Sequence, residues 1–171
     1  AEMYEKAIAV DGQLVQAHAG LAQVRIASDD LEGAIATLRK AVSLDPKYGE
    51  GFVLIGTALI KLQRHGEAIA PLNSAVGVDG KNSQARYRLA EAYLGMGEYR
   101  AAIESGMAAV SRQKDFYDAQ VILADAHSEL GQLEEALTWY SRAIADSRYK
   151  DYCAHRLQEL DSAQAQAQGQ R

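Results

Sequence analysis

The sequence contains one cysteine, two prolines and few aromatic residues among 171, and it has no long apolar run. The single cysteine, Cys153, excludes an intramolecular disulfide framework and any metal site built from several cysteines. No apolar stretch reaches the roughly 18 residues that a membrane-spanning helix needs, so we expect no direct insertion into a membrane. The net charge is only −5 and no basic stripe is visible, which argues against a nucleic-acid partner.

The residues that are abundant favour helices. Hydrophobic residues make up 48% of the chain, enough for a buried core, and alanine, leucine and glutamine recur throughout. These side chains lose little freedom in a helix, whereas proline breaks one. The chain opens inside a helical pattern, "AEMYEKAIAV", without an initiator methionine. We therefore expect a piece of a longer protein, and the compartment stays undefined.

A repeat of 34 residues runs through the chain. Three series of positions share this step: an alanine series, a second alanine series always followed by Ile or Leu, and a leucine or isoleucine series. Their members are Ala7, Ala41, Ala75, Ala109 and Ala143; Ala34, Ala68, Ala102 and Ala136; and Leu21, Ile55, Leu89, Leu123 and Leu157. Independent series with one period indicate a repeat architecture, in which each unit is stable only when stacked on its neighbours.

Within each unit the apolar residues follow helical spacing and break near the middle, which predicts a pair of helices. Glycine, proline or aspartate marks the turns. The predicted helices span 2–11, then 15–28 and 31–44, 49–62 and 65–78, 83–96 and 99–112, 117–130 and 133–146, with a last helix from about 151 to 165.

The pattern resembles the tetratricopeptide repeat, as in Leu89, Ala90, Tyr93 and Ala102, or in Leu123, Ala124, Ala136 and Tyr140. This resemblance implies an all-α fold, a right-handed superhelical α-solenoid of stacked antiparallel helix pairs. We expect one solenoid domain, divided into the second helix of a truncated repeat (1–14), four repeats (15–48, 49–82, 83–116 and 117–150), a capping helix (151–165) and a disordered tail (166–171).

Three positions depart from the pattern. Gly106 stands where a bulky aromatic residue is usual, so a neighbour must fill the space or the third pair is soft. Pro71 lies inside a second helix and should remove one backbone hydrogen bond and kink the helix. Trp139 should be partly exposed, covering the last helix or else contacting the convex side.

No catalytic motif is present: the chain lacks a P-loop, a G-x-G-x-x-G fingerprint, H-E-x-x-H and G-x-S-x-G. His127 replaces a packing tyrosine, which favours a structural role. His155 and Glu159 have the i, i+4 spacing of some metal sites, but no third ligand is present. We therefore expect them to be solvated residues of the capping helix. We expect no enzyme activity, no cofactor and no metal.

The resemblance implies that the first helix of each pair lines a concave groove for a partner. The predicted groove residues are Gln23, Ile26, Val53, Thr57, Ile60, Tyr87, Glu91, Leu94, Val121, Asp125, Ser128 and His155. The N-terminal half of the groove is aliphatic and amide-bearing, and its C-terminal half is acidic. This predicts a partner protein or peptide segment with apolar and basic residues. The alternative is that the acids only keep the surface soluble.

Two specialised subtypes of the family are not supported. A carboxylate clamp would need lysine and asparagine, where this chain has, for example, Val53, Thr57 and Tyr87; an asparagine ladder would need asparagine at Leu54 and Arg88. The leading hypothesis is a non-catalytic interaction scaffold. The alternatives are self-association through the exposed N-terminal helix, or a regulatory domain of a larger enzyme or complex.

Overall fold

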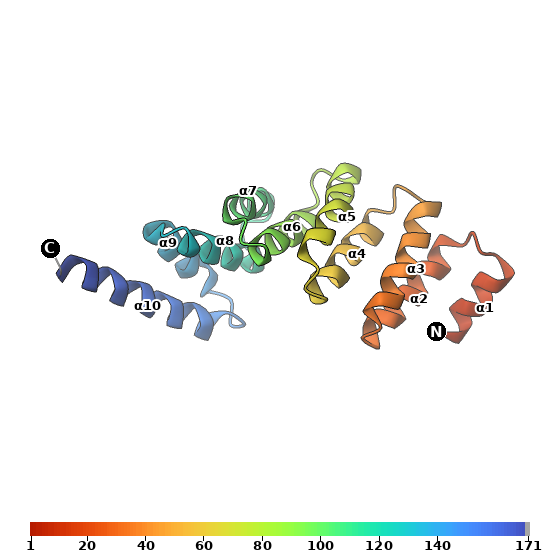
Figure 1. Ribbon diagram of the computed structural model, residues 1–171, viewed down its shortest axis with the longest axis horizontal. Coiled ribbons are helices and arrows are strands. Elements are labelled where there is room, and N and C mark those ends of the chain that lie inside the picture. The colour runs from red at the N-terminus through yellow and green to blue at the C-terminus, as the bar shows by residue number, and fades with distance from the viewer. Residues whose placement is uncertain (170–171) are drawn as a thin grey trace.

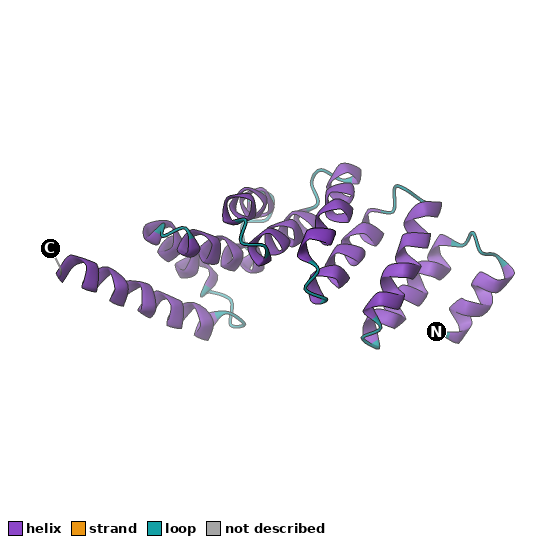
Figure 2. Cartoon of the chain, viewed as in Figure 1, coloured by secondary structure: helices purple, strands orange, loops and turns teal. Residues whose placement is uncertain are grey.

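A computed structural model describes residues 1–169. Helices and connecting loops make up this part of the chain, with no strand (Figure 2). The helices are α1 (Glu2–Val10), α2 (Val15–Ala27), α3 (Leu31–Leu44), α4 (Gly49–Lys61), α5 (His65–Val78), α6 (Ser83–Gly95), α7 (Tyr99–Val110), α8 (Tyr117–Glu129), α9 (Leu133–Ala143) and α10 (Lys150–Gly169). The predicted all-α solenoid is confirmed.

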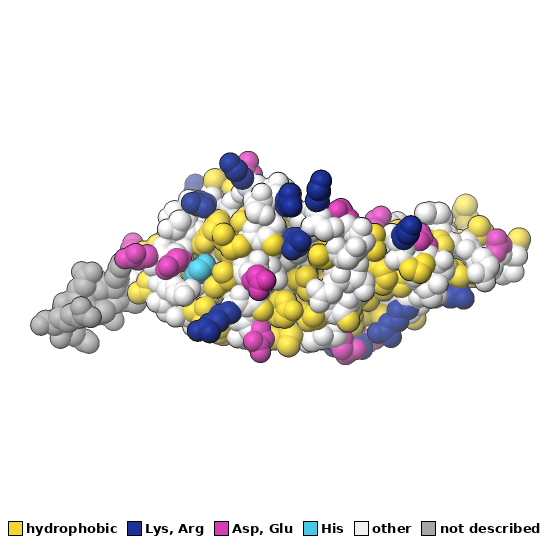
Figure 3. All heavy atoms as spheres, turned by 90° about the horizontal axis from the view of Figure 1, so that it is seen from above, with side chains coloured by type: hydrophobic (Ala, Val, Ile, Leu, Met, Phe, Trp, Pro, Cys, Tyr) yellow, Lys and Arg dark blue, Asp and Glu magenta, His cyan; other side chains and the backbone are white. Residues whose placement is uncertain are grey.

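The helices stand side by side along one long axis, with the two termini at opposite ends (Figure 1). The first helices α4, α6 and α8 contact one another directly, whereas successive second helices touch at most weakly. In a curved stack the inner layer is the tighter one, so the first helices form the concave side and the second helices the convex side. From above, hydrophobic side chains spread along the length of the molecule, and most charged side chains lie toward the borders (Figure 3).

The alanines that reveal the repeat are the points of closest helix packing. Those at the start of each second helix are fully buried, as are those seven residues later: Ala34, Ala68, Ala102 and Ala136, and Ala41, Ala75, Ala109 and Ala143. A methyl side chain lets two backbones approach closely, and larger residues such as Leu38, Leu72 and Tyr140 fill the adjoining space.

The turn inside each pair requires one residue with a positive φ. This residue recurs every 34 positions, as Asp29 (φ 62°), Gln63 (59°), Gly97 (75°) and Gly131 (70°). Glycine adopts this conformation without a steric penalty, while aspartate and glutamine have to tolerate it. The backbone conformation therefore repeats every 34 residues at this position, although the residue type differs between units.

The departures from the pattern are accommodated locally. A Cβ on Gly106 would lie 3.0 Å from Leu123 Cγ, so the neighbouring leucine occupies the space of the missing aromatic side chain. Helix α5 continues unbroken through Pro71. Helix α10 extends to Gly169, beyond the expected end near 165; of the predicted tail, residues 170 and 171 lie outside the described part of the chain.

Candidate functional site

A hollow of about 430 Å³ opens on the concave side of the C-terminal half. Helices α6, α8 and α10 and the start of α7 supply its lining, which is Leu94, Tyr99, Asp125, Glu129, Tyr152 and Arg156. Helix α10 takes the place that the first helix of a further pair would have. The hollow therefore brings together residues from three successive units.

Asp125 on α8 is the centre of this hollow. Its Oδ1 accepts hydrogen bonds from the Tyr140 hydroxyl on α9 (2.5 Å) and the Tyr152 hydroxyl on α10 (2.7 Å). The Tyr140 ring is fully buried and meets the Tyr152 ring edge-on, with 6.2 Å between centroids. One carboxylate oxygen thus ties α9 and α10 to α8, while Oδ2 makes no hydrogen bond within the described residues.

Arg156 on α10 extends across the same cluster. Its Nε donates to the Tyr140 hydroxyl (3.1 Å), one terminal nitrogen to Glu159 (2.8 Å) and the other to Ser128 Oγ (3.1 Å). The planar guanidinium can serve several acceptors at once, which suits it to this crossing of helices. Ser128 and Asp125, both predicted groove residues, are therefore already engaged by the chain itself.

Burial raises the pKa of Asp125 above its ordinary value of 3.8, although hydrogen bonds from Tyr140 and Tyr152 and the charge of Arg156 oppose the shift. Removal from water disfavours the charged carboxylate more than these partners favour it. Burial also raises the pKa of Tyr140, and it raises the pKa of Tyr152 to about 12, assisted by the hydrogen bond to Asp125. Both tyrosines therefore remain hydrogen-bond donors at neutral pH.

The raised pKa of Asp125 predicts an unusual pH dependence of stability. The folded state holds the Asp125 proton more tightly than the unfolded state, so this group lowers the free energy of unfolding as pH rises from about 3.8 through the folded pKa. Asp125→Asn keeps an acceptor for both tyrosines and removes the titration. We expect the difference in stability, wild type minus variant, to fall as pH rises over this window in urea denaturation; a constant or rising difference would contradict the prediction.

The acidic character predicted for this half of the groove is largely neutralised within the chain. Glu91 pairs with Arg88 (2.6 Å), and Asp118 pairs with Arg148 (3.1 Å) and accepts from the Tyr149 hydroxyl (2.8 Å). Glu91 is thus neutralised by an arginine one helical turn away, and Asp118 by an arginine in the loop after α9. In this half of the groove, the carboxylates without an ion pair among the described residues are Asp125 and Glu129, both in the hollow.

The twelve predicted groove residues fall into three groups. Four are buried and support the groove from beneath, contrary to the expectation that they offer surface: Val53, Ile60, Tyr87 and Val121. Six are half-buried along the concave side: Ile26, Thr57, Glu91, Leu94, Asp125 and Ser128. Two are exposed: Gln23 and His155. The buried residues are covered because small residues such as Ala75 and Ala85 beside Val53 bring the adjacent helices close.

Sequence reasoning missed Glu129, Tyr99, Tyr140 and Arg156 as parts of this site. Tyr99 donates from the start of α7 to Glu129 at the end of α8, over 3.3 Å and thirty residues of sequence. Tyr140 was assigned only to packing, and Arg156 lies one residue beyond a predicted position. One signal was present in the sequence: Leu157 continues the 34-residue leucine series of the first helices. This places α10 in the position of a first helix and puts the neighbouring Arg156 near the groove.

The two histidines that the sequence singled out, His127 and His155, make short-range contacts with neighbouring side chains. His127 Nδ1 lies 2.7 Å from the side-chain oxygen of Gln132, within the turn between α8 and α9. His155 and Glu159 are 3.7 Å apart on the surface of α10. Among the described residues no group of three histidine, cysteine or acidic side chains could hold a metal ion, and no helix there is long and apolar enough to cross a membrane.

Solved structures share this architecture. MamA is 26% identical and superposes with a TM-score of 0.80, covering 87% of each chain. YrrB, described as a tetratricopeptide repeat protein with an unusual peptide-binding site, is 22% identical with a TM-score of 0.79, covering 90% of this chain and 79% of its own. The thermophilic protein TTC0263 of Thermus thermophilus is 20% identical with a TM-score of 0.71, covering 93% and 87%.

No curated protein gives a significant match. Three models of the tetratricopeptide repeat match the chain, over residues 15–48, 59–105 and 87–150. Together with the stacked helix pairs and their buried alanines, these matches establish that the chain belongs to the tetratricopeptide repeat family.

Proposed function

We propose that the chain is a non-catalytic scaffold that holds an extended segment of a partner protein along its concave side. The family and its helical-repeat architecture support a role in protein interaction, because a stack of this kind presents a long curved surface built from rigid elements. YrrB, which has the same fold, is described as having a peptide-binding site.

The observation that carries the proposal is the acidic hollow beside Leu94. Two carboxylates, Asp125 and Glu129, line it together with the half-exposed Tyr152 ring. The one cation in the lining, Arg156, is paired with Glu159. A lysine or arginine of the partner would meet Asp125 Oδ2 and Glu129, and its aliphatic stem would lie against Leu94 and Tyr152. The other acids are paired with arginines, so the basic residue is expected at this hollow and not along the whole half.

The N-terminal half of the concave side suits the apolar part of the segment. Ile26 and Thr57 are half-buried there and Gln23 is exposed, with Val53 and Ile60 closing the surface beneath. None of these side chains carries a charge. An extended segment with apolar residues followed by one basic residue would match both halves.

The test is calorimetric titration with capped peptides that place apolar residues next to a lysine, compared with the same peptides carrying glutamate. Glu129→Arg reverses the charge of the hollow without touching the hydrogen bonds of Asp125. We expect it to weaken binding of the lysine peptides at least tenfold. Glu104→Arg makes the same charge change on exposed α7 of the convex layer and should leave binding unchanged. Equal affinities for both variants would refute the hollow as the binding site.

Self-association is the second candidate, because α1 has no buried residue and exposes Met3 and Val10, at 84% and 89%. Exposed apolar side chains on a helix at the end of an open stack favour head-to-tail contact between copies. Light scattering over a range of concentrations tests this. A mass that rises with concentration in the wild type, but not in Met3→Glu, Val10→Glu, would support it; a constant monomer mass would exclude it.

A further inference from the structure

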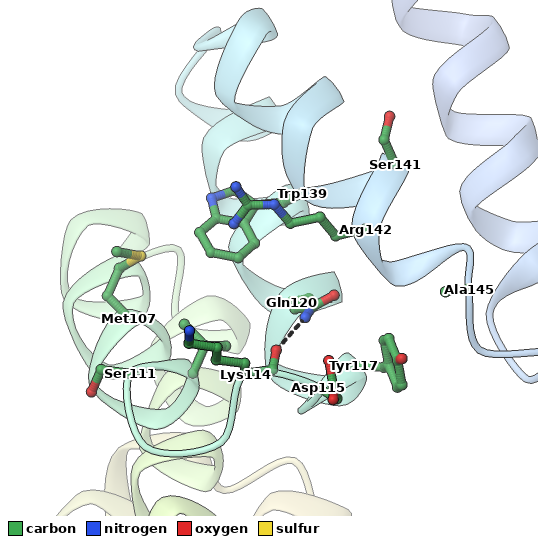
Figure 4. A pocket seen from close by; sticks show the side chains of 11 residues that line it. Met107, Ser111, Lys114, Asp115, Tyr117, Gln120, Trp139, Ser141, Arg142 and Ala145 are labelled. Carbon is green, nitrogen blue, oxygen red and sulfur yellow. Dashed lines mark hydrogen bonds between the residues drawn. The ribbon is translucent and has the colours of Figure 1, made fainter.

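A second hollow, of about 700 Å³, lies on the convex side between α7 and α9 and shares no lining residue with the concave hollow. Met107 of α7 and Trp139 of α9 form its apolar walls, and Lys114 of the connecting loop and Arg142 of α9 supply positive charge (Figure 4). The Arg142 guanidinium lies 4.6 Å from the centre of the Trp139 ring. Trp139 is half-buried: it packs against the cluster that includes Cys153 and Leu160 of α10, and it also lines this hollow.

The shape of this hollow is a product of the repeat. An equivalent hollow of about 640 Å³ occurs two units earlier, lined by Pro46, Ser74 and others. On the 34-residue step Pro46 corresponds to Lys114 and Ser74 to Arg142, while Pro71 corresponds to Trp139. The earlier hollow has one cation, Lys47, and no tryptophan in its lining. The hollow at α7 and α9 has two cations, Lys114 and Arg142, together with Trp139.

Neither cation of this hollow is neutralised by a carboxylate within the described residues. On the concave side Arg88, Arg148 and Arg156 each pair with a carboxylate, whereas neither Lys114 nor Arg142 forms an ion pair within the described part of the chain. Asp115 is the one acidic residue in the lining and also makes no ion pair there. Unpaired cations beside an exposed apolar wall complement an anionic ligand with an apolar side chain.

The floor of the hollow adds a polar contact. Gln120 is 4% exposed, and its Nε2 donates to the Lys114 carbonyl over 2.6 Å. His18 and Arg86 hold the preceding turns in the same way, through the carbonyls of Gly12 and Gly80, so this bond is structural. The other side-chain atom, Oε1, is buried without a partner among the described residues.

We propose that this convex hollow is a second binding site, which takes an acidic protein segment carrying one large apolar side chain. The apolar side chain lies between Met107 and Trp139, and flanking carboxylates pair with Lys114 and Arg142. The site is independent of the concave groove, so the scaffold can hold two partner segments of opposite charge on its two sides.

Trp139 is the one tryptophan of the chain, so its fluorescence reports directly on this hollow. The probe is a capped peptide of sequence DEFED, titrated into the full chain, with DEAED and KKFKK for comparison. We expect a saturable change in emission with DEFED, a binding at least tenfold weaker for DEAED, and none for KKFKK. No change in emission up to millimolar DEFED would overturn the proposal.

The variants Arg142→Glu and Lys114→Glu should each weaken binding of DEFED at least tenfold. Because Arg142→Glu alters the surroundings of Trp139 itself, binding is also measured by the fluorescence anisotropy of a labelled peptide. Lys40→Glu is the matched control, since Lys40 is exposed and occupies the Arg142 position three units earlier. Equal losses in the control, or none in the site variants, would refute the site. Displacement of the peptide by inorganic tripolyphosphate at similar affinity would show a simple anion site and overturn a peptide ligand.

Discussion

Tyr140→Ala is expected to lower the free energy of unfolding by about 3–5 kcal/mol, the range for removing a buried aromatic side chain. Tyr140 is fully buried and is the bulkiest such side chain of the described core. It packs with Ala136, Ala143 and Cys153, and its hydroxyl joins Asp125 to Arg156. The change would open a cavity and leave the partly buried Asp125 with one donor fewer. Urea denaturation measures the effect.

Tyr140→Phe separates the two contributions. The ring stays and only the hydroxyl is lost, so we expect a cost of about 1–3 kcal/mol from the unsatisfied partners. Tyr152→Phe is the matched control, because Tyr152 donates to the same Asp125 oxygen from a ring that is 43% exposed. Its cost should be smaller. If Tyr140→Ala and Tyr152→Phe destabilise the protein equally, the cluster is not a packing centre.

Removing α10 by truncation after Tyr149 is expected to cost on the order of 5 kcal/mol, because Cys153, Leu157 and Leu160 are withdrawn from the core. The last pair, α8 and α9, would then expose the apolar surface that α10 covers, including Tyr140. Open stacks need such a terminal element, since each pair is stable only against a neighbour. We expect a lower midpoint in urea and a tendency to aggregate.

A shorter truncation, after Ser162, keeps Cys153, Leu157 and Leu160 and serves as the control. It should leave the midpoint within experimental scatter. An unchanged midpoint after the longer truncation would show that α10 does not cap the stack. A loss of stability confined to α8 and α9, followed by hydrogen exchange, would agree with the expected short-range coupling between units.

The helices could be predicted closely because the 34-residue period carries both the packing and the turns. Differences arise at helix ends where contacts outside the repeat pattern take over: α7 ends at Val110 and α9 at Ala143, each short of its predicted end at 112 and 146. After α9, the loop folds back through Arg148, which pairs with both Asp146 and Asp118. Such contacts join residues far apart in sequence and leave no periodic signal.

The candidate site was predicted less well for the same reason. The positions facing the concave side were found, but Val53, Ile60, Tyr87 and Val121 are buried, since exposure depends on how closely the next unit approaches. The acids were read as free charge, and most are paired with arginines. The predicted residue Asp125 lines the hollow, whereas Glu129 and Tyr99 join the lining only because consecutive units stack.

The sequence by itself determined the repeat and the helix pairs, because small and large residues at a constant step fix how the helices stack. The tertiary structure decided which of those residues remain accessible, which charges remain unpaired, and where hollows open between the outer helices. These properties depend on side chains that meet across different units, about thirty residues apart in the chain, as Tyr152 and Asp125 do.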